Sequence, residues 1–245
     1  MLLFVLTSCG SAQLPVDPVD YVNPYMGNIS HLLVPTYPTI HLPNSMLRVY
    51  PERSDFTGDL LRGLPLIITS HRGSSAFNLS PFQGEEKDLK PVISYSYDQE
   101  KLTPYSWSVY LDRQNTDVRF GLSHQSALYE IDFGMDETAY LILNSRNGTM
   151  KWDGEAISGS QSLENNTRVF LYMKPELSPE TASVLTNSGL TPGKEASGRN
   201  ACIALKYGKG IKSIRLRYGI SFIDEPQARK NMERELGNSS LKTIQ

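Results

Sequence analysis

The sequence predicts an all-β fold, and three observations support this prediction. Many segments alternate apolar and polar residues with a period of two, which is the pattern of a strand with one buried face. Short turn sequences separate these segments, such as RNGT at 146–149 and YGKG at 207–210. The composition, with 13 Tyr, 18 Gly and 15 Pro, also favours strands broken by turns. Many strands at a spacing of about 8–12 residues are typical of a sandwich or a barrel.

The strand candidates become clearest from residue 106 onward. The segment SWSVYL at 106–111 puts Trp107, Val109 and Leu111 on one face. In IRLRYGISF at 214–222 the apolar face ends with Phe222, which is therefore expected to be buried. Two segments, LPLIIT at 64–69 and AYLILN at 139–144, are continuously apolar, so we expect strands buried on both faces. The remaining alternating segments are TDVRFGL at 116–122, ALYEIDF at 127–133, RVFLYM at 168–173 and ACIALKY at 201–207.

The apolar period changes from that of a strand to that of a helix at residue 224. Asp224 is a suitable N-cap with Gln227 three residues later, and Gly237 is a suitable C-terminal stop. We predict one helix over about 224–237, packed against an edge of the domain and leading toward a following domain. Its narrow apolar stripe, at i, i+4 and i+8, consists of Ala228, Met232 and Leu236.

The N-terminus has the features of an export signal. In MLLFVLTSCGSAQ an apolar run is followed by small residues, and Leu6-Thr7-Ser8-Cys9 resembles the bacterial lipoprotein signal. This pattern predicts lipidation at Cys9, with a chance cysteine beside a plain signal peptide as the alternative. The run lacks a preceding Lys or Arg, so we expect the true start a few codons upstream. The expected location is lipid-anchored at the periplasm or outer membrane of a Gram-negative bacterium, with membrane contact only through the anchor.

The bulk composition limits the classes of function. A formal net charge of −2 argues against a nucleic-acid partner, which usually requires a basic surface. A hydrophobic content of 39% in 245 residues is enough for a sizeable core, in one large all-β domain or two smaller domains. If Cys9 carries lipid, the only other cysteine, Cys202, has no disulfide partner in the chain.

Most common catalytic motifs are absent from the sequence, including GxSxG, HExxH, the P-loop and CxxC. We interpret GKGIKS at 208–213 as a hairpin turn, because its spacing does not fit a phosphate loop. No second histidine lies at metal-ligand spacing from any histidine, so no metal site is predicted. The loop after LPLIIT carries His71 and Arg72 among hydroxyl residues, which could donate to a sugar or an anion. A plain surface loop is the alternative interpretation.

Several short motifs resemble glycoside hydrolase family 92, the calcium-dependent exo-α-mannosidases common in Bacteroides-type bacteria. DYVNPYMG at 20–27 resembles that family's opening VNPFIG. Thr36-Tyr37-Pro38, followed at the right spacing by Pro43 and Met46, is similar to its T-F-P-x4-P-F-G-M motif. Ser70-His71 is similar to its F-S-H loop, and GISFIDEPQARKNMERELG at 219–237 is similar to its domain junction.

The resemblance implies a large antiparallel two-sheet β-sandwich (supersandwich) followed by a linker helix and then an (α/α)6 barrel. In the family that barrel holds the catalytic carboxylates and most calcium contacts. No catalytic residue is therefore expected here, this chain alone is predicted to be inactive, and no cofactor is predicted for it although the full-length family uses calcium. The implied partners are α-mannoside glycans and the barrel domain. The implied sugar-subsite residues are Thr36, Tyr37, Pro38, Ser70 and His71, to which we add Arg72 for its chemistry.

Four regions are then expected along the chain. They are a lipoprotein-type signal segment at 1–9, a flexible tether at 10–19, the β-sandwich domain at 20–222, and the linker helix with a truncated end at 223–245. Two alternatives stay open besides the N-terminal domain of an α-mannosidase. The chain could act as a stand-alone carbohydrate-binding surface lipoprotein, or be an inactive remnant of a split gene.

Overall fold

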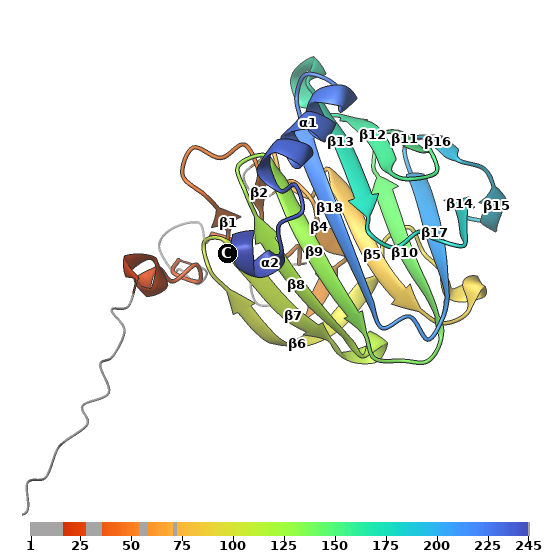
Figure 1. Cartoon of the computed structure of the whole chain (residues 1–245), viewed down its shortest axis with the longest axis horizontal. Helices are drawn as coiled ribbons and strands as arrows, with labels where there is room; N and C mark the ends of the chain where they lie inside the picture. The colour runs from red at the N-terminus through yellow and green to blue at the C-terminus, as the bar shows by residue number, and fades with distance from the viewer. Residues whose placement is uncertain (1–16, 28–35, 54–57, 71–72, 245) are drawn as a thin grey trace, which may run out of the picture.

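The computed structural model describes residues 17–27, 36–53, 58–70 and 73–244, and these residues form a two-sheet antiparallel β-sandwich (Figure 1). The all-β prediction is confirmed, and of its two forms the structure is the sandwich. The six-stranded sheet contains, in spatial order, β15 (Gly189–Pro192), β14 (Thr181–Thr186), β17 (Ala201–Lys209), β10 (Thr138–Ser145), β5 (Phe77–Gln83) and β4 (Leu64–Pro65).

The ten-stranded sheet covers the other side of the core. Its strands, in spatial order, are β16 (Glu195–Gly198), β11 (Gly148–Trp152), β12 (Ile157–Ser162), β13 (Arg168–Pro175), β18 (Ser213–Ser221), β9 (Ser126–Phe133), β8 (Thr116–Leu122), β7 (Ser106–Leu111), β6 (Ser94–Leu102) and β3 (Leu60–Arg62). A separate pair joins β1 (Ile40–His41) to β2 (Arg48–Val49). Short 3-10 turns lie at η1 (Pro18–Tyr21), η2 (Glu86–Asp88), η3 (Asp112–Gln114) and η4 (Glu164–Asn166).

The core between the sheets is made by the inward faces of the alternating strands. Trp107, Val109 and Leu111 of β7 are buried while their neighbours along the strand are partly exposed, as the alternation predicts. Two buried tyrosines connect the layers, because the hydroxyl of Tyr129 donates to the carbonyl of Pro65 at 2.7 Å and that of Tyr218 to a nearby carbonyl. Burial raises the pKa of both phenols well above the usual value, so they remain neutral donors.

One apolar segment behaves as predicted and the other does not. AYLILN forms β10, which lies between β17 and β5 and is buried on both faces. In LPLIIT, residues 64–68 are buried and Thr69 is exposed, and only Leu64 and Pro65 belong to a strand. The backbone N–H of Leu66 donates to Ser75 Oγ at 2.9 Å, and the carbonyl of Leu66 accepts from the hydroxyl of Tyr218 at 2.8 Å. Because side chains satisfy this backbone, no strand neighbour is required.

The connection at 208–213 is not the hairpin turn that the sequence predicts. It links β17, which pairs with β10 and β14, to β18, which pairs with β13 and β9. Each strand already has two neighbours, so the turn passes from one sheet to the other. Phe222 is a second correction, since β18 ends at Ser221 and Phe222 is 38% exposed. The Ser221 hydroxyl accepts from the N–H of Ile223 at 2.9 Å, where the chain turns away from the sheet.

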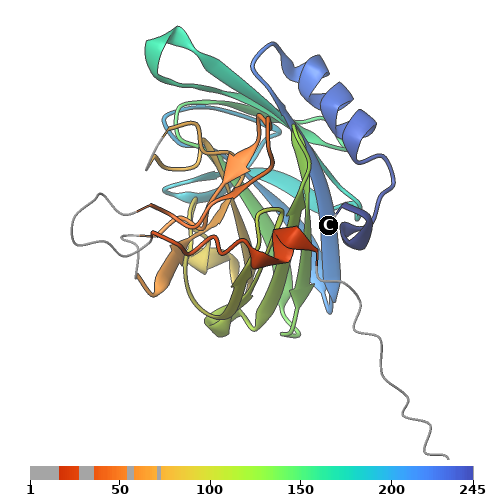
Figure 2. The same cartoon turned by 90° about the vertical axis from the view of Figure 1, so that its left-hand side faces the viewer.

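The predicted helix is α1 (Glu225–Glu235), and it lies on the outer face of the ten-stranded sheet over β18 and β13 (Figure 2). Asp224 caps it by accepting from the N–H of Gln227 at 2.7 Å, and Gly237 follows it with a φ of +47°. The residues of its apolar stripe are buried and pack against Ala156 and Tyr172. A shorter helix, α2 (Leu241–Ile244), contacts β8 and β9.

Gly219 of β18 allows α1 to approach the sheet closely. A Cβ at this position would lie 2.2 Å from the carbonyl oxygen of Ala228 and 2.8 Å from the amide nitrogen of Met232. Only glycine therefore fits beneath the helix. Neither helix in the described part of the chain is long and apolar enough to cross a membrane.

Candidate functional site

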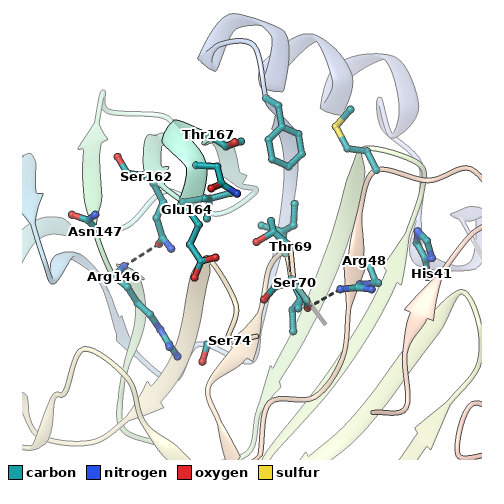
Figure 3. A pocket seen from close by; sticks show the side chains of 17 residues that line it. His41, Arg48, Thr69, Ser70, Ser74, Arg146, Asn147, Ser162, Glu164 and Thr167 are labelled. Atoms are coloured by element: carbon teal, nitrogen blue, oxygen red, sulfur yellow. Dashed lines mark hydrogen bonds between the residues drawn. The ribbon is translucent and has the colours of Figure 1, made fainter. Parts of the chain in front are cut away.

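A cleft with a volume of about 880 Å³ opens where β1 and β2, the loop after β4 and the β12–β13 connection approach one another (Figure 3). Apart from the consecutive strands β1 and β2, these segments lie far apart in sequence, so the sandwich fold itself assembles the cleft. The lining residues are His41, Met46, Arg48, Ile67, Ile68, Thr69, Ser70, Ser74, Arg146, Asn147, Gln161, Ser162, Leu163, Glu164, Asn165, Thr167 and Phe222.

One wall of the cleft is polar and is held by a buried carboxylate behind it. Arg146 extends from the turn between β10 and β11, and its Nη2 donates to Glu52 Oε1 at 2.8 Å. Glu52 is only 4% exposed, and its other oxygen accepts from the N–H of Ser75 at 2.9 Å. The N–H of Arg146 donates to Gln161 Oε1 at 3.0 Å. Gln161 thus holds the backbone of Arg146 and Glu52 holds its guanidinium, and Figure 3 shows this side chain among those that line the cleft.

A free carboxylate stands on the same wall. Glu164 begins η4, in which Asn165 and Asn166 have positive φ values of 57° and 56°, a conformation that asparagine tolerates better than most residues. Figure 3 shows the carboxylate of Glu164 directed into the cleft. Among the described residues no hydrogen bond or ion pair engages it. It is thus available as an acceptor for hydroxyl groups of a ligand.

Apolar side chains also line the cleft. Ile67, Met46 and Phe222 line it, and Phe222 and Met46 are 38% and 41% exposed. Two further lining residues are joined to each other, because Arg48 Nη2 donates to the carbonyl of Ser70 at 2.8 Å. A cleft lined by both polar and apolar groups suits a sugar, whose ring has apolar C–H faces and polar hydroxyl edges.

The predicted site residues are only partly brought together. Ser70 lines the cleft. Tyr37 lies outside it but stacks on Tyr50, with ring centroids 4.5 Å apart, and the Tyr50 hydroxyl donates to the carbonyl of Gly73. Tyr37 is thus connected to the loop that contains Ser70, although the sequence between them is long.

The other predicted site residues do not reach the cleft or cannot be placed. Pro38 is buried, and the N–H of Thr36 donates to the carbonyl of Gly27 at 2.9 Å, away from the cleft lining. His71 and Arg72 lie outside the described residues, as does the predicted lipidation site Cys9.

Sequence reasoning missed most of the residues that form the walls. Arg146 lies in RNGT, which the sequence marks only as a turn, and Phe222 is indistinguishable from the buried positions of its strand pattern. The run Glu164-Asn165-Asn166 carries a usable signal, because adjacent asparagines beside an acidic residue favour a left-handed turn that displays side chains. Arg48 carried no signal in the sequence.

The N-terminal segment that carries VNPYMG is held at a separate place, on β6. The hydroxyl of Tyr25 donates to Glu100 Oε2 at 3.1 Å, and Trp107 Nε1 donates to Glu100 Oε1 at 3.2 Å. Arg53 pairs with the same carboxylate and lies over the ring of Tyr97, 4.9 Å from its centroid. Burial and the charge of Glu100 raise the pKa of Tyr25, so its phenol stays a donor at neutral pH.

The described residues do not by themselves form a calcium site. No group of three or more His, Cys, Asp or Glu side chains comes together among them. Calcium takes about 6–8 oxygen ligands, whereas the cleft offers Glu164 as a carboxylate not already bound to arginine.

Comparison with known proteins identifies relatives of this chain. A model of the glycosyl hydrolase family 92 N-terminal domain matches residues 21–221. The fold is similar to the GH92 inverting mannosidase BT2199 of Bacteroides thetaiotaomicron VPI-5482, with a TM-score of 0.79 and 22% identity over 92% of this chain and 34% of that chain. It is also similar to the GH92 α-mannosidase BT3965 of Bacteroides thetaiotaomicron, with a TM-score of 0.78 and 17% identity over 92% of this chain and 36% of that chain.

The extent of these matches limits what they mean. The chain spans about a third of the length of the solved structures that it resembles. At these identities the structural likeness concerns the fold alone. No curated protein sequence matches the chain.

Proposed function

The chain belongs to glycosyl hydrolase family 92, as an N-terminal domain of that family, and from this premise we propose that its cleft binds the terminal sugar of an α-mannoside. The observation that carries the proposal is that one cleft is lined both by the unpaired carboxylate of Glu164 and by the partly exposed ring of Phe222. A sugar ring would place a C–H face against Phe222 and its hydroxyls near Glu164 and Asn165. The loop containing Ser70, with His71 and Arg72 adjoining it in sequence, would frame the same subsite.

We propose further that this domain does not hydrolyse glycosides by itself. Inverting hydrolysis needs one carboxylic acid and one carboxylate about 6.5–9.5 Å apart. Of the described carboxylates at the cleft, Glu52 is bound by Arg146, which leaves Glu164 without a partner for acid–base chemistry. A catalytic barrel domain would supply the acid, the base and the calcium ligands. Release of mannose from a mannobioside by residues 10–245 alone, with calcium present, would contradict this part of the proposal.

Calorimetric titration of residues 10–245 with methyl α-D-mannopyranoside tests binding. We expect saturable heat in the native chain and binding weakened by about tenfold or more in Glu164→Ala, since a carboxylate hydrogen bond contributes roughly 1.5–3 kcal/mol. Glu195→Ala is the matched control, because Glu195 is an exposed carboxylate on β16 away from the cleft lining. Equal affinity of the Glu164 and Glu195 variants would refute the assignment of the cleft.

Attachment to a membrane is a separate proposal. We propose that export exposes Cys9 to lipidation and that the protein is anchored at the periplasm or outer membrane. Cys202 is a buried free thiol, so it is not available to bridge with Cys9 in the folded domain. Expression of the chain and of Cys9→Ala in a Gram-negative host, followed by membrane fractionation, decides this. Equal amounts of both proteins in the soluble fraction would exclude the anchor.

A further inference from the structure

Helix α1 forms hydrogen bonds to the turn between β8 and β9, in addition to the apolar contacts that pack the helix on the sheet. Glu235, in the last turn of α1, accepts through Oε2 from the N–H of Gln125 at 2.7 Å and from the hydroxyl of Ser126 at 2.6 Å. The Glu235 side chain is only 10% exposed. Arg234 adds a second contact, because its Nη2 donates to Gln125 Oε1 at 2.6 Å. The turn between β8 and β9, at residues 123–125, is therefore held from the outside by α1.

The same turn holds a second segment on its other side. The carbonyl of His124 accepts from the backbone N–H groups of Met46 and Leu47, both at 2.9 Å, and from the hydroxyl of Ser45 at 2.9 Å. A carbonyl oxygen has two lone pairs, so three donors saturate it. The segment 45–47 thus takes its position from the turn.

Residues of that segment and the residue after it line the cleft. Met46 and Arg48 both line the cleft, and Arg48 donates to the carbonyl of Ser70 at 2.8 Å. The carbonyl of Arg48 in turn accepts from the N–H of Ile68 at 2.9 Å. A continuous series of hydrogen bonds therefore leads from Glu235 through the turn to residues 45–48, and then to the loop that carries Ser70.

We propose that Glu235 is a positioning residue for the cleft. Through the turn at 123–125 it would hold residues 45–48, two of which line the cleft. The carboxylate is charged and nearly buried, and hydrogen bonds to a charged acceptor are roughly twice as strong as neutral ones. Removing it leaves the N–H of Gln125 and the hydroxyl of Ser126 without their acceptor, and the turn relaxes. The helix itself remains docked through Ala228 and Met232, which are buried against the sheet. For sugar affinity, this inference rests on the binding function proposed above.

Hydrogen exchange of the backbone amides of Met46 and Leu47 tests the inference without any ligand. In Glu235→Ala we expect both amides to exchange about tenfold faster, because their acceptor carbonyl sits in the released turn. Glu235→Gln keeps an oxygen acceptor and should restore part of the protection. The matched control is Glu233→Gln on the same helix, since Glu233 forms a solvent-exposed ion pair with Arg229 at 2.7 Å.

Comparing amide exchange at Met46 and Leu47 with amide exchange in β10 distinguishes a local positioning effect from a general loss of stability. The amides of β10, in the other sheet, should be unchanged in every variant. Unchanged protection of Met46 and Leu47 in Glu235→Ala would overturn the proposal, and so would equal acceleration in β10. If Glu235→Ala does not fold, Ser126→Ala removes one of the two bonds from the other side and should accelerate the same amides.

Titration with methyl α-D-mannopyranoside is the functional readout. We expect Glu235→Ala to weaken binding by about fivefold, as the loss of one ordinary hydrogen bond would, and Glu233→Gln to leave it unchanged. If the native chain does not bind this sugar, the proposed function fails, while the exchange experiment still decides the role of Glu235. Native sugar affinity in a Glu235→Ala protein whose amides exchange faster would refute the positioning of the cleft.

Discussion

The close contact between α1 and β18 leads to a quantitative prediction for Gly219→Ala. The added Cβ would lie 2.2 Å from the carbonyl oxygen of Ala228 and 2.8 Å from the amide nitrogen of Met232. Both are helix backbone atoms, so no side-chain rotation relieves the overlap, and α1 has to move away from the sheet. That movement opens the apolar contact of Met232 and Leu236, and it lengthens the hydrogen bond from Asn231 Nδ2 to the Ile220 carbonyl, now 2.8 Å.

The expected loss of stability lies between two limits. Overpacking with partial adjustment costs about 1–3 kcal/mol. Complete release of the helix would expose Met232 and Leu236, at about 1.5–3 kcal/mol for each side chain. We therefore expect Gly219→Ala to lower the free energy of unfolding by about 2–4 kcal/mol, the middle of this range with one weakened hydrogen bond included.

Urea unfolding followed by far-UV circular dichroism measures this loss from the shift of the midpoint at constant slope. Gly208→Ala in β17 is the matched control, because its Cβ would meet the carboxylate group of Glu180, the end of an exposed side chain that can rotate away. We expect the control to stay within about 0.5 kcal/mol of the native chain. If the Gly219→Ala protein is as stable as the control, the close contact between α1 and β18 does not require glycine, and the reasoning is refuted.

Three further predictions concern charge and titration. Glu100→Gln leaves Arg53, whose side chain is 5% exposed, without its carboxylate and should cost about 3–5 kcal/mol, measured by thermal unfolding. Burial raises the pKa of Asp153, but the N–H groups of Ala156 and its neighbour outweigh it and lower the pKa overall. Its stabilisation is therefore present above the unfolded pKa and lost as pH falls through the folded pKa. Solvent screens this exposed carboxylate, so we expect Asp153→Asn to destabilise at pH 7 by less than about 1 kcal/mol, and this difference to shrink as the pH falls below the unfolded pKa. Burial raises the pKa of Cys202 to about 12, so iodoacetamide should modify it only upon unfolding, and rapid modification without denaturant would contradict this.

The elements with strong local patterns were predictable from the sequence alone. The alternation around Trp107 places it in the core, and the cap at Asp224 and the stop at Gly237 set the ends of α1 within two residues of the prediction. These features depend on neighbours along the chain, because a period of two or of 3.6 residues fixes which side chains share a face. The family resemblance followed from motifs at 20–46 and 219–237, whose order is visible without any structure.

Tertiary structure decided which strands are neighbours and where the cleft lies. Alternation indicates that one face of a strand is buried, but it does not say in which of two sheets, which is why the 208–213 connection was wrongly predicted as a hairpin. The burial of Leu66 without a strand partner depends on Ser75 and Tyr218, the latter 152 residues away. The cleft likewise combines Arg48, Arg146 and other side chains from distant segments, and Phe222 turns outward only because β18 ends one residue earlier. Contacts between segments so far apart leave no local period in the sequence, so only the folded chain determines them.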